Sequence, residues 1–415
     1  MSTIASQDPA VAALMARERD RQQTTLNLIA AENTAPAAVL EALGSAFGNK
    51  TAEGYPGRRY HTGCGVSDEM EQLAIDRAKA LFGAGHANVQ PHSGVNANLA
   101  VYGAVLTPGD RILSMQLSHG GHLSHGDAAT ITGRIFQASH YGVDPETERL
   151  DYDAIRKLAR EVRPRMLVAG ASSYPRLIDY VALRSIADEV SAYLLVDMAH
   201  IAGLVAAKVI PSPVPHAHFV TFTTYKTLMG PHGGMILCGA EHARKIDRSI
   251  FPGTQGTPTL ALVAAKAVCF HIAATPAFRA IQERTLRAAA RLAAELEARG
   301  LRPVSGGTDN HMVLADLRGR KLKGDRAEAA LEAAGILANR NVIPFDPEST
   351  LTTSGLRFGT PGISTRGMGE DEVALVAGWI DEVLTRPDDT SVRDRVRAEV
   401  QAACRRFPLP ATIAV

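Results

Sequence analysis

A single lysine, Lys226, stands among hydroxyl residues directly after an apolar, β-branched run, and glycines follow it closely. The run Phe219-Val220-Thr221-Phe222-Thr223 favours a β-strand that ends just before the lysine. A lysine at the mouth of a buried sheet loses hydration, so its amine can be neutral and nucleophilic. That property suits a Schiff base with a carbonyl cofactor. The alternative is an exposed loop residue, because most lysines are exposed.

Other reactive groups follow neighbouring apolar runs. The segments 166–172 and 193–200 each pass from aliphatic residues to polar ones, with a helical stretch between them. Such alternation predicts a parallel sheet buried on both faces. Ligands of such sheets bind beyond the carboxyl ends of the strands, where Asp197, His200 and Lys226 are expected. An aspartate there can hold a protonated ring nitrogen, although a helix cap or a turn could also use it.

Two further segments carry groups suited to binding. The glycine-rich stretch 48–65 contains Glu53, Tyr60 and His61, and loops of this composition often carry function, although a solvated connection is the alternative. Ser93 and Gly94 begin an alanine-rich helix, whose free N–H groups suit a phosphate, although a plain helix cap looks the same.

Three histidines, His119, His122 and His125, recur at three-residue spacing. No cysteine or carboxylate lies within this motif, residues 119–126, so we expect stacking or hydrogen bonding there and no metal.

Bulk composition excludes several classes of function. The 415 residues include 44 basic and 43 acidic side chains, so no global charge attracts nucleic acid or an anionic membrane. No membrane span or signal peptide is evident. The four cysteines are widely spaced and unpaired in pattern, which favours a reducing, cytoplasmic setting.

The chain divides by character into three parts. Residues 1–40 form N-terminal helices and an arm, residues 41–278 form a large α/β domain with a mainly parallel sheet, and residues 279–415 form a smaller α+β domain.

Long ordered motifs resemble the serine hydroxymethyltransferase family along nearly the whole chain. They are Ala52-Glu-Gly-Tyr-Pro-Gly, Asn88-Val-Gln-Pro-His-Ser-Gly94, His119-Gly-Gly-His-Leu-Ser-His-Gly126, Val196-Asp-Met-Ala-His-Ile-Ala-Gly-Leu204 and Val304-Ser-Gly-Gly-Thr-Asp-Asn-His311. The resemblance implies pyridoxal-phosphate (PLP) fold type I, tetrahydrofolate as co-substrate, and a homodimer with shared active sites. It leaves open whether two dimers pair into a tetramer.

The resemblance also implies roles for individual residues. Lys226 would carry the cofactor, Asp197 would pair with its ring nitrogen, His119 would stack on its ring, and His200 and Ser172 would flank the ring oxygen. Ser93, Gly94, Thr223 and Tyr225 would hold the phosphate end, with Gly256 from the partner subunit. Arg357 would clamp the amino-acid carboxylate. Glu53 would be the partner's acid–base group, and Tyr60 and Asn341 would lie along the folate.

Several positions depart from the family pattern around the substrate and the phosphate. The family has serine at Ala31, tyrosine at Thr51 and His61, serine at Val95, histidine at Tyr225 and arginine at His232. The tyrosine replaced by Thr51 lies close to the α-carbon of the substrate, so its loss leaves room for a methyl group there. The pattern therefore resembles the α-methylserine hydroxymethyltransferase branch, with D-alanine as the shorter amino acid.

Three alternatives stay open from the sequence. One is an ordinary serine/glycine hydroxymethyltransferase, and another is a folate-independent relative such as a threonine transaldolase or a carbon–sulfur lyase. The third is an inactive regulatory protein, which Lys226, Asp197 and Arg357 argue against.

Overall fold

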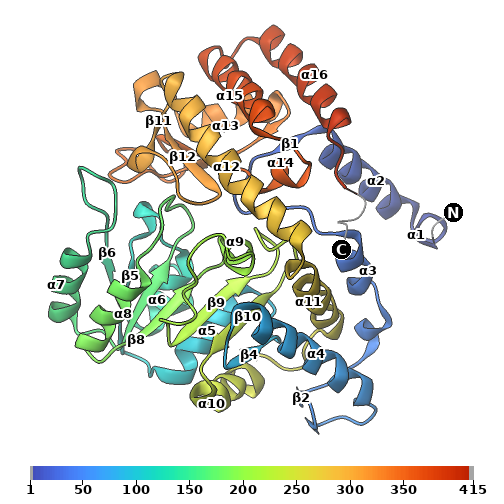
Figure 1. The fold of residues 1–415 in the computed structure, drawn as a ribbon, viewed down its shortest axis with the longest axis vertical. Helices are drawn as coiled ribbons and strands as arrows, with labels where there is room; N and C mark the ends of the chain where they lie inside the picture. Colours follow the sequence, from blue (N-terminus) through green and yellow to red (C-terminus); the bar gives the residue numbers. More distant parts are fainter. Residues whose placement is uncertain (1–2, 411–415) are drawn as a thin grey trace.

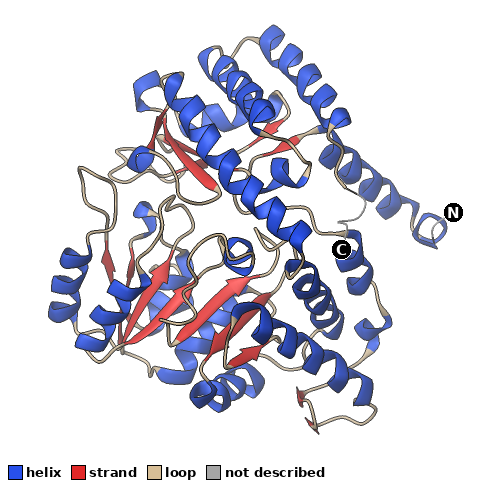
Figure 2. Ribbon diagram, viewed as in Figure 1, coloured by secondary structure: helices blue, strands red, loops and turns tan. Residues whose placement is uncertain are grey.

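A seven-stranded sheet forms the centre of the larger part of the chain in the computed structural model, which describes residues 3–410 (Figures 1 and 2). The strand order is β4-β10-β9-β8-β7-β5-β6, and β10 is antiparallel to both of its neighbours while the other adjacent pairs are parallel. The strands are β4 (His86–Asn88), β5 (Arg111–Met115), β6 (Gln137–Tyr141), β7 (Met166–Gly170), β8 (Tyr193–Asp197), β9 (Phe219–Thr223) and β10 (Gly234–Cys238).

Helices cover both faces of this sheet because its central strands are apolar on both sides. Leu194 and Val196 of β8 face one layer, whereas Leu195 faces the other. The first layer contains α4 (Gly65–Phe82), α7 (Tyr152–Val162), α8 (Tyr180–Glu189), α9 (Ala202–Ala206) and α11 (Leu260–Ala273). The second contains α5 (Gly94–Val105) and α10 (Ala243–Arg248). The result is the α/β sandwich that the alternating runs predict.

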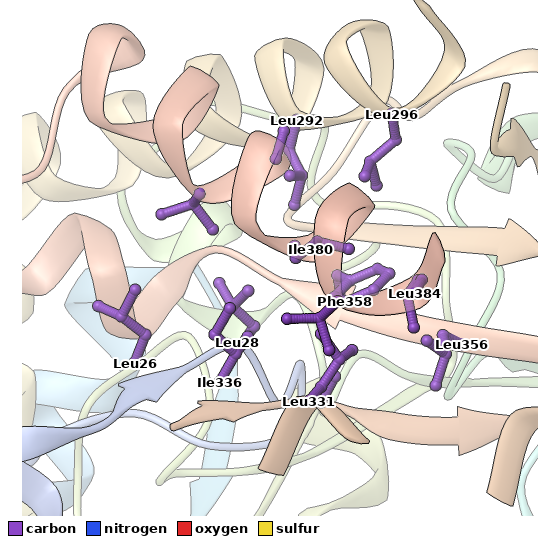
Figure 3. Close-up of a cluster of buried hydrophobic side chains, with 14 of the residues drawn as sticks. Leu26, Leu28, Leu292, Leu296, Leu331, Ile336, Leu356, Phe358, Ile380 and Leu384 are labelled. Carbon is purple, nitrogen blue, oxygen red and sulfur yellow. The ribbon is translucent and has the colours of Figure 1, made fainter. Parts of the chain in front are cut away.

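A smaller unit follows, built on the antiparallel sheet β11-β12-β15-β14. Its strands are β11 (Arg302–Pro303), β12 (Met312–Asp316), β14 (Asn339–Asn341) and β15 (Gly355–Gly359), and its helices are α12 (Pro276–Ala298), α13 (Gly324–Ala333), α15 (Glu370–Thr385) and α16 (Thr390–Arg406). Figure 3 shows part of its core, where Ile380 of α15 lies beside Phe358 of β15 and Leu292 of α12 belongs to the same apolar cluster.

The N-terminal segment contributes to this second core. After α1 (Thr3–Gln7) and α2 (Pro9–Thr24), the short strand β1 (Leu26–Asn27) pairs in parallel with β13 (Ile336–Leu337). Leu26 and Leu28 are fully buried there. Residues 26–28 therefore pack with the C-terminal unit, and the predicted boundary at residues 278/279 falls inside α12.

Polar contacts also join the two units. The carboxylate of Glu148 accepts hydrogen bonds from Nη1 and Nη2 of Arg302, both at 2.8 Å, and from the backbone N–H of Ser305 at 2.7 Å. Within residues 3–410 no single helix is long and apolar enough to cross a membrane; α11 and α12 pass that test only jointly, across a bend of 78°.

Candidate active site

A cavity of about 180 Å³ lies at the carboxyl ends of β7, β8 and β9. This is the edge at which open α/β sheets bind ligands. Its wall is formed by His92, Ser93, Gly94, Val95, His122, His125, Ala171, Ser172, Asp197, Ala199, His200, Thr223, Tyr225, Lys226, His232 and Gly233. Lysine, carboxylate and imidazole groups from distant segments thus meet in one cavity.

Lys226 lies three residues beyond the end of β9 and is 7% exposed. Burial lowers the pKa of its amine to about 8, while Asp197 raises it and Arg357 lowers it further. The Nζ atom is 5.8 Å from the centre of the Tyr225 ring. Near neutral pH a substantial share of the amine is therefore neutral and able to attack a carbonyl group.

Asp197 ends β8 and is held by a hydrogen-bond network. Its Oδ2 accepts from Nδ2 of Asn98 at 2.9 Å and lies 3.1 Å from Nε2 of His125, while Oδ1 accepts from the N–H of Ala199 at 3.0 Å. Burial opposes the charge, but these donors and His122 outweigh it and hold the pKa of Asp197 well below its usual range. The site therefore contains a fixed negative charge that can keep a ring nitrogen protonated.

Asn98 and its neighbours were missed by sequence reasoning. The Oδ1 of Asn98 accepts from the hydroxyl of Thr221 at 2.6 Å, and its Nδ2 also approaches Oγ of Ser124 at 3.0 Å. Ser124 in turn lies 2.8 Å from Nδ1 of His122. Asn98 lies one turn into α5, far in sequence from Asp197 and Thr221, and no motif links the three residues. Only the folded structure reveals this network.

The structure corrects the expectation for His119. His122 lies on the cavity wall, whereas His119 does not, because its Nδ1 accepts from the N–H of Val143 at 3.1 Å and its ring packs against Phe345 at 4.7 Å between centroids. His122 is thus the imidazole of this motif that is available for ring stacking. Burial lowers the pKa of His122 to about 4, so its ring is neutral.

The three-histidine motif also meets a carboxylate, contrary to the premise used against a metal. His122, His125 and Asp197 each offer a ligand atom, and these atoms lie within 4.8 Å of one another. The observed hydrogen bonds already account for the geometry, since His125 faces Asp197 directly. The expectation of no metal stays a prediction.

One end of the cavity is a cradle for an anion. The Ser93 side chain caps α5 by accepting from the N–H of Asn96, so the first turn of a 12-residue helix faces the cavity. A Cβ at Gly94 would lie 2.7 Å from Cγ2 of Thr223, so only glycine fits there. Tyr225 stacks on His232 with ring centroids 3.8 Å apart at 11°.

The opposite side of the cavity joins the two units. His200 lies on the wall and stacks on the buried His311, which precedes β12, with centroids 5.7 Å apart. Burial lowers the pKa of His200 well below its usual value and that of His311 to about 3. The Nδ1 atom of His200 is buried and has no hydrogen-bond partner, so it can serve a ligand group.

Arg357 stands next to this wall, on β15. Its Nη1 donates to the carbonyl oxygen of Ser172, and its Nε donates to Oδ1 of Asn339 at 3.2 Å. Burial lowers the pKa of Arg357 to about 10, which leaves it charged at neutral pH. A buried cation at the mouth of the site suits a carboxylate ligand.

The remaining predicted residues are not on this cavity wall. Glu53, next to the hairpin of β2 (Gly54–Tyr55) and β3 (Arg58–Arg59), has its Oε1 3.4 Å from where a Cβ of Gly256 would lie. The amide of Ala52 donates to Thr257 at 3.0 Å, so these two segments form one surface. Thr51, Tyr60, His61 and Gly256 are exposed, while Ala31 and Asn341 are half-buried outside the cavity.

These groups fit pyridoxal phosphate. A buried lysine is available for the aldehyde, Asp197 for the ring nitrogen, His122 for the ring face, the unpaired Nδ1 of His200 for a ring substituent, and the glycine-lined cradle for the phosphate. Fold and site together define an α/β enzyme of the pyridoxal-phosphate type. The family model of serine hydroxymethyltransferase matches residues 4–380, and the chain belongs to that family.

Membership fixes the general chemistry. The family has PLP fold type I, with the cofactor covalently bound to a lysine and tetrahydrofolate as co-substrate. The chain is thus a PLP-dependent hydroxymethyltransferase that acts on an amino acid and folate.

Proposed function

We propose that the amino acid is α-methylserine, with D-alanine as the shorter product or acceptor. The reaction is 5,10-methylenetetrahydrofolate + D-alanine + water = α-methylserine + tetrahydrofolate. The observation that carries the proposal is the exposed Thr51 beside the Glu53–Gly256 surface, where the family has tyrosine. Replacing a phenol ring with a two-carbon side chain removes far more volume than the added α-methyl group occupies.

Other departures support a reshaped site. Val95, Tyr225 and His232 all line the cavity, so three of the six changed positions lie on the wall that would surround the cofactor. Tyr225 stacks on His232, so its ring is held on the cavity wall beside that imidazole. The pKa of Tyr225 is raised, first by burial, so its hydroxyl keeps its proton and can donate to the phosphate.

The protein groups divide the chemical work. When bound, the cofactor supplies an electron sink for the carbanion left at the α-carbon. Lys226 releases and recaptures the cofactor aldehyde as the amino acid enters and leaves, and Asp197 keeps the ring nitrogen protonated. Arg357 binds the amino-acid carboxylate. Glu53 takes the proton of the hydroxymethyl group or positions a water that does so.

Glu53 and Thr51 do not line the cavity of their own subunit. We therefore infer a homodimer in which these two residues complete the active site of the partner subunit. Mixing Lys226→Met with Glu53→Gln subunits tests this. Each parent has little activity, and the mixed dimers regain one intact site. Failure of the mixture to regain activity, with subunit exchange shown by mass spectrometry, would contradict shared sites.

The acceptor preference tests the proposed substrate. With 5,10-methylenetetrahydrofolate we expect kcat/KM for D-alanine to exceed that for glycine by about 10-fold or more, the usual worth of a filled methyl pocket. Thr51→Tyr should reverse the preference, whereas Thr62→Tyr adds the same bulk at an exposed position of the same loop and should not. Preference of the wild-type enzyme for glycine would identify an ordinary serine/glycine enzyme. Turnover without folate would point to a folate-independent relative.

A further inference from the structure

Lys266 is a fully buried lysine that lies behind the phosphate end of the cavity rather than on its wall. It comes from the middle of α11, and its Nζ donates to three backbone carbonyls: Val89 at 2.7 Å, Gly234 at 2.8 Å and Pro91 at 3.0 Å. Burial lowers the pKa of Lys266 to about 7, whereas the negative charge of Glu71 raises it. A neutral amine has only two protons to donate, so the three hydrogen bonds belong to the ammonium form, which predominates below that pKa and which a phosphate dianion bound nearby would favour further.

The three carbonyls belong to the two segments that make the cradle. Val89 and Pro91 lead from β4 into Ser93 and Gly94, and Gly234 begins β10 directly after the wall residue Gly233. The segments touch, since the N–H of Gly234 donates to the carbonyl of Pro91 at 3.0 Å. The lysine stem lies directly behind the wall, where a Cβ at Gly233 would lie 2.6 Å from Cε of Lys266.

The charge of Lys266 also reaches the cavity. The pKa of His92, a wall residue, is lowered first by burial and then by the positive charge of Lys266. This matters because His232 stands on the wall where the family has arginine. If hydroxyls, an imidazole and a helix N-terminus hold a phosphate dianion there, a cation behind these groups strengthens its binding electrostatically.

We propose that Lys266 is a positioning residue for the phosphate group of the cofactor: its buried ammonium ties together the two cradle segments and sets a positive charge behind them. The role is independent of which amino acid the enzyme uses. A lysine that serves only to satisfy buried carbonyls would stabilise the fold without distinguishing a phosphorylated ligand from an unphosphorylated one.

The test compares two ligands that differ only in the phosphate. Dissociation constants of pyridoxal 5′-phosphate and pyridoxal are measured by absorbance with the wild-type apoenzyme and with Lys266→Met. We expect affinity for pyridoxal phosphate to fall about 10-fold or more, as for loss of hydrogen bonds to a charged group. Affinity for pyridoxal should change less than about threefold, since it lacks the group that the cradle binds.

Gln282→Met is the matched control. Gln282 is also a buried polar residue, and its Nε2 donates to the carbonyl of Thr227 at 2.9 Å, next to the catalytic lysine and away from the cradle. It should weaken both ligands by equal factors. Equal weakening of both ligands by Lys266→Met would overturn the proposal and leave Lys266 with a purely structural role.

Removal of a buried cation costs folding stability, so a second measurement uses the wild-type apoenzyme. Inorganic phosphate should raise its melting temperature above that in chloride of equal ionic strength, and Lys266→Gln, which retains two donors, should reduce that rise. A wild-type apoenzyme that phosphate does not stabilise beyond chloride would overturn the proposal by itself.

Discussion

The pKa of Lys226 makes a quantitative prediction about cofactor capture. A shift from 10.5 to about 8 raises the neutral fraction of the amine at pH 7.5 from about 0.1% to about 24%, or about 240-fold. The fall in pKa from 10.5 to about 8 corresponds to about 3.4 kcal/mol of preference for the neutral form. The rate at which the apoenzyme captures an aldehyde should therefore rise with pH to a midpoint near 8 and then level off.

Two variants should move that midpoint in opposite directions. Asp197→Asn removes a negative charge that raises the pKa of Lys226, so the midpoint should fall. Arg357→Leu removes a positive charge that lowers the same pKa, so the midpoint should rise. Both charges act through a buried, weakly screened medium, which makes their effects measurable.

The assay uses pyridoxal, because its capture does not depend on the phosphate cradle. Apoenzyme is mixed with pyridoxal at a series of pH values, trapped with borohydride and mapped by peptide mass spectrometry, with the exposed Lys208 as internal reference. A wild-type midpoint near 10.5, or a label away from Lys226, would refute the reasoning. So would shifts of both variants in the same direction.

Three further predictions concern the supporting groups. Asn98→Leu removes a donor to the Asp197 carboxylate and should weaken cofactor binding about 10-fold. Thr221→Val removes only the hydroxyl that donates to Oδ1 of Asn98, so it should weaken binding less; equal effects of the two variants on the dissociation constant would contradict this. Burial holds the pKa of His122 at about 4 and that of His311 at about 3, both below the unfolded value of 6.5, so the stability present above pH 6.5 is lost as the pH falls through about 4 for His122 and about 3 for His311. Urea titrations of the apoenzyme should show this decline, and a flat profile would exclude it. Glu148→Gln should lower the free energy of unfolding by about 1–3 kcal/mol because it weakens charged hydrogen bonds between the two units, while the exposed Glu146→Gln should leave it unchanged in the same denaturation experiment.

The strand-end residues could be placed from the sequence because the sheet obeys a simple rule. Apolar runs that end in polar residues predicted β7, β8 and β9, and the shared direction of parallel strands brings their carboxyl ends to one edge. Lys226, Asp197 and His200 accordingly meet on one cavity wall. Ser93 and Gly94 follow from the same logic, since a helix start next to such an edge faces the same space.

Side-chain direction could not be predicted in the same way. His119 and His122 belong to one glycine-rich turn, which has no helical or strand periodicity from which the direction of each imidazole could be predicted. In the structure, contacts with Val143 and Phe345 hold His119 away from the cavity. The packing of residues 26–28 in the C-terminal core is equally hidden, because a two-residue strand has no detectable periodicity. Long-range pairing alone reveals it.

The departures on the wall are coupled by packing rather than independent. Tyr225 and His232 form a face-to-face stack, so the change at each position is fitted to the change at the other. The pair replaces the histidine and the arginine of the family with a phenol and an imidazole, which lowers the positive charge on the wall itself. The charge that remains at this end lies behind the wall, on Lys266, together with the N-terminal dipole of α5. Binding of the phosphate in this chain therefore depends more on backbone groups, and on the lysine that fixes them, than on a direct ion pair.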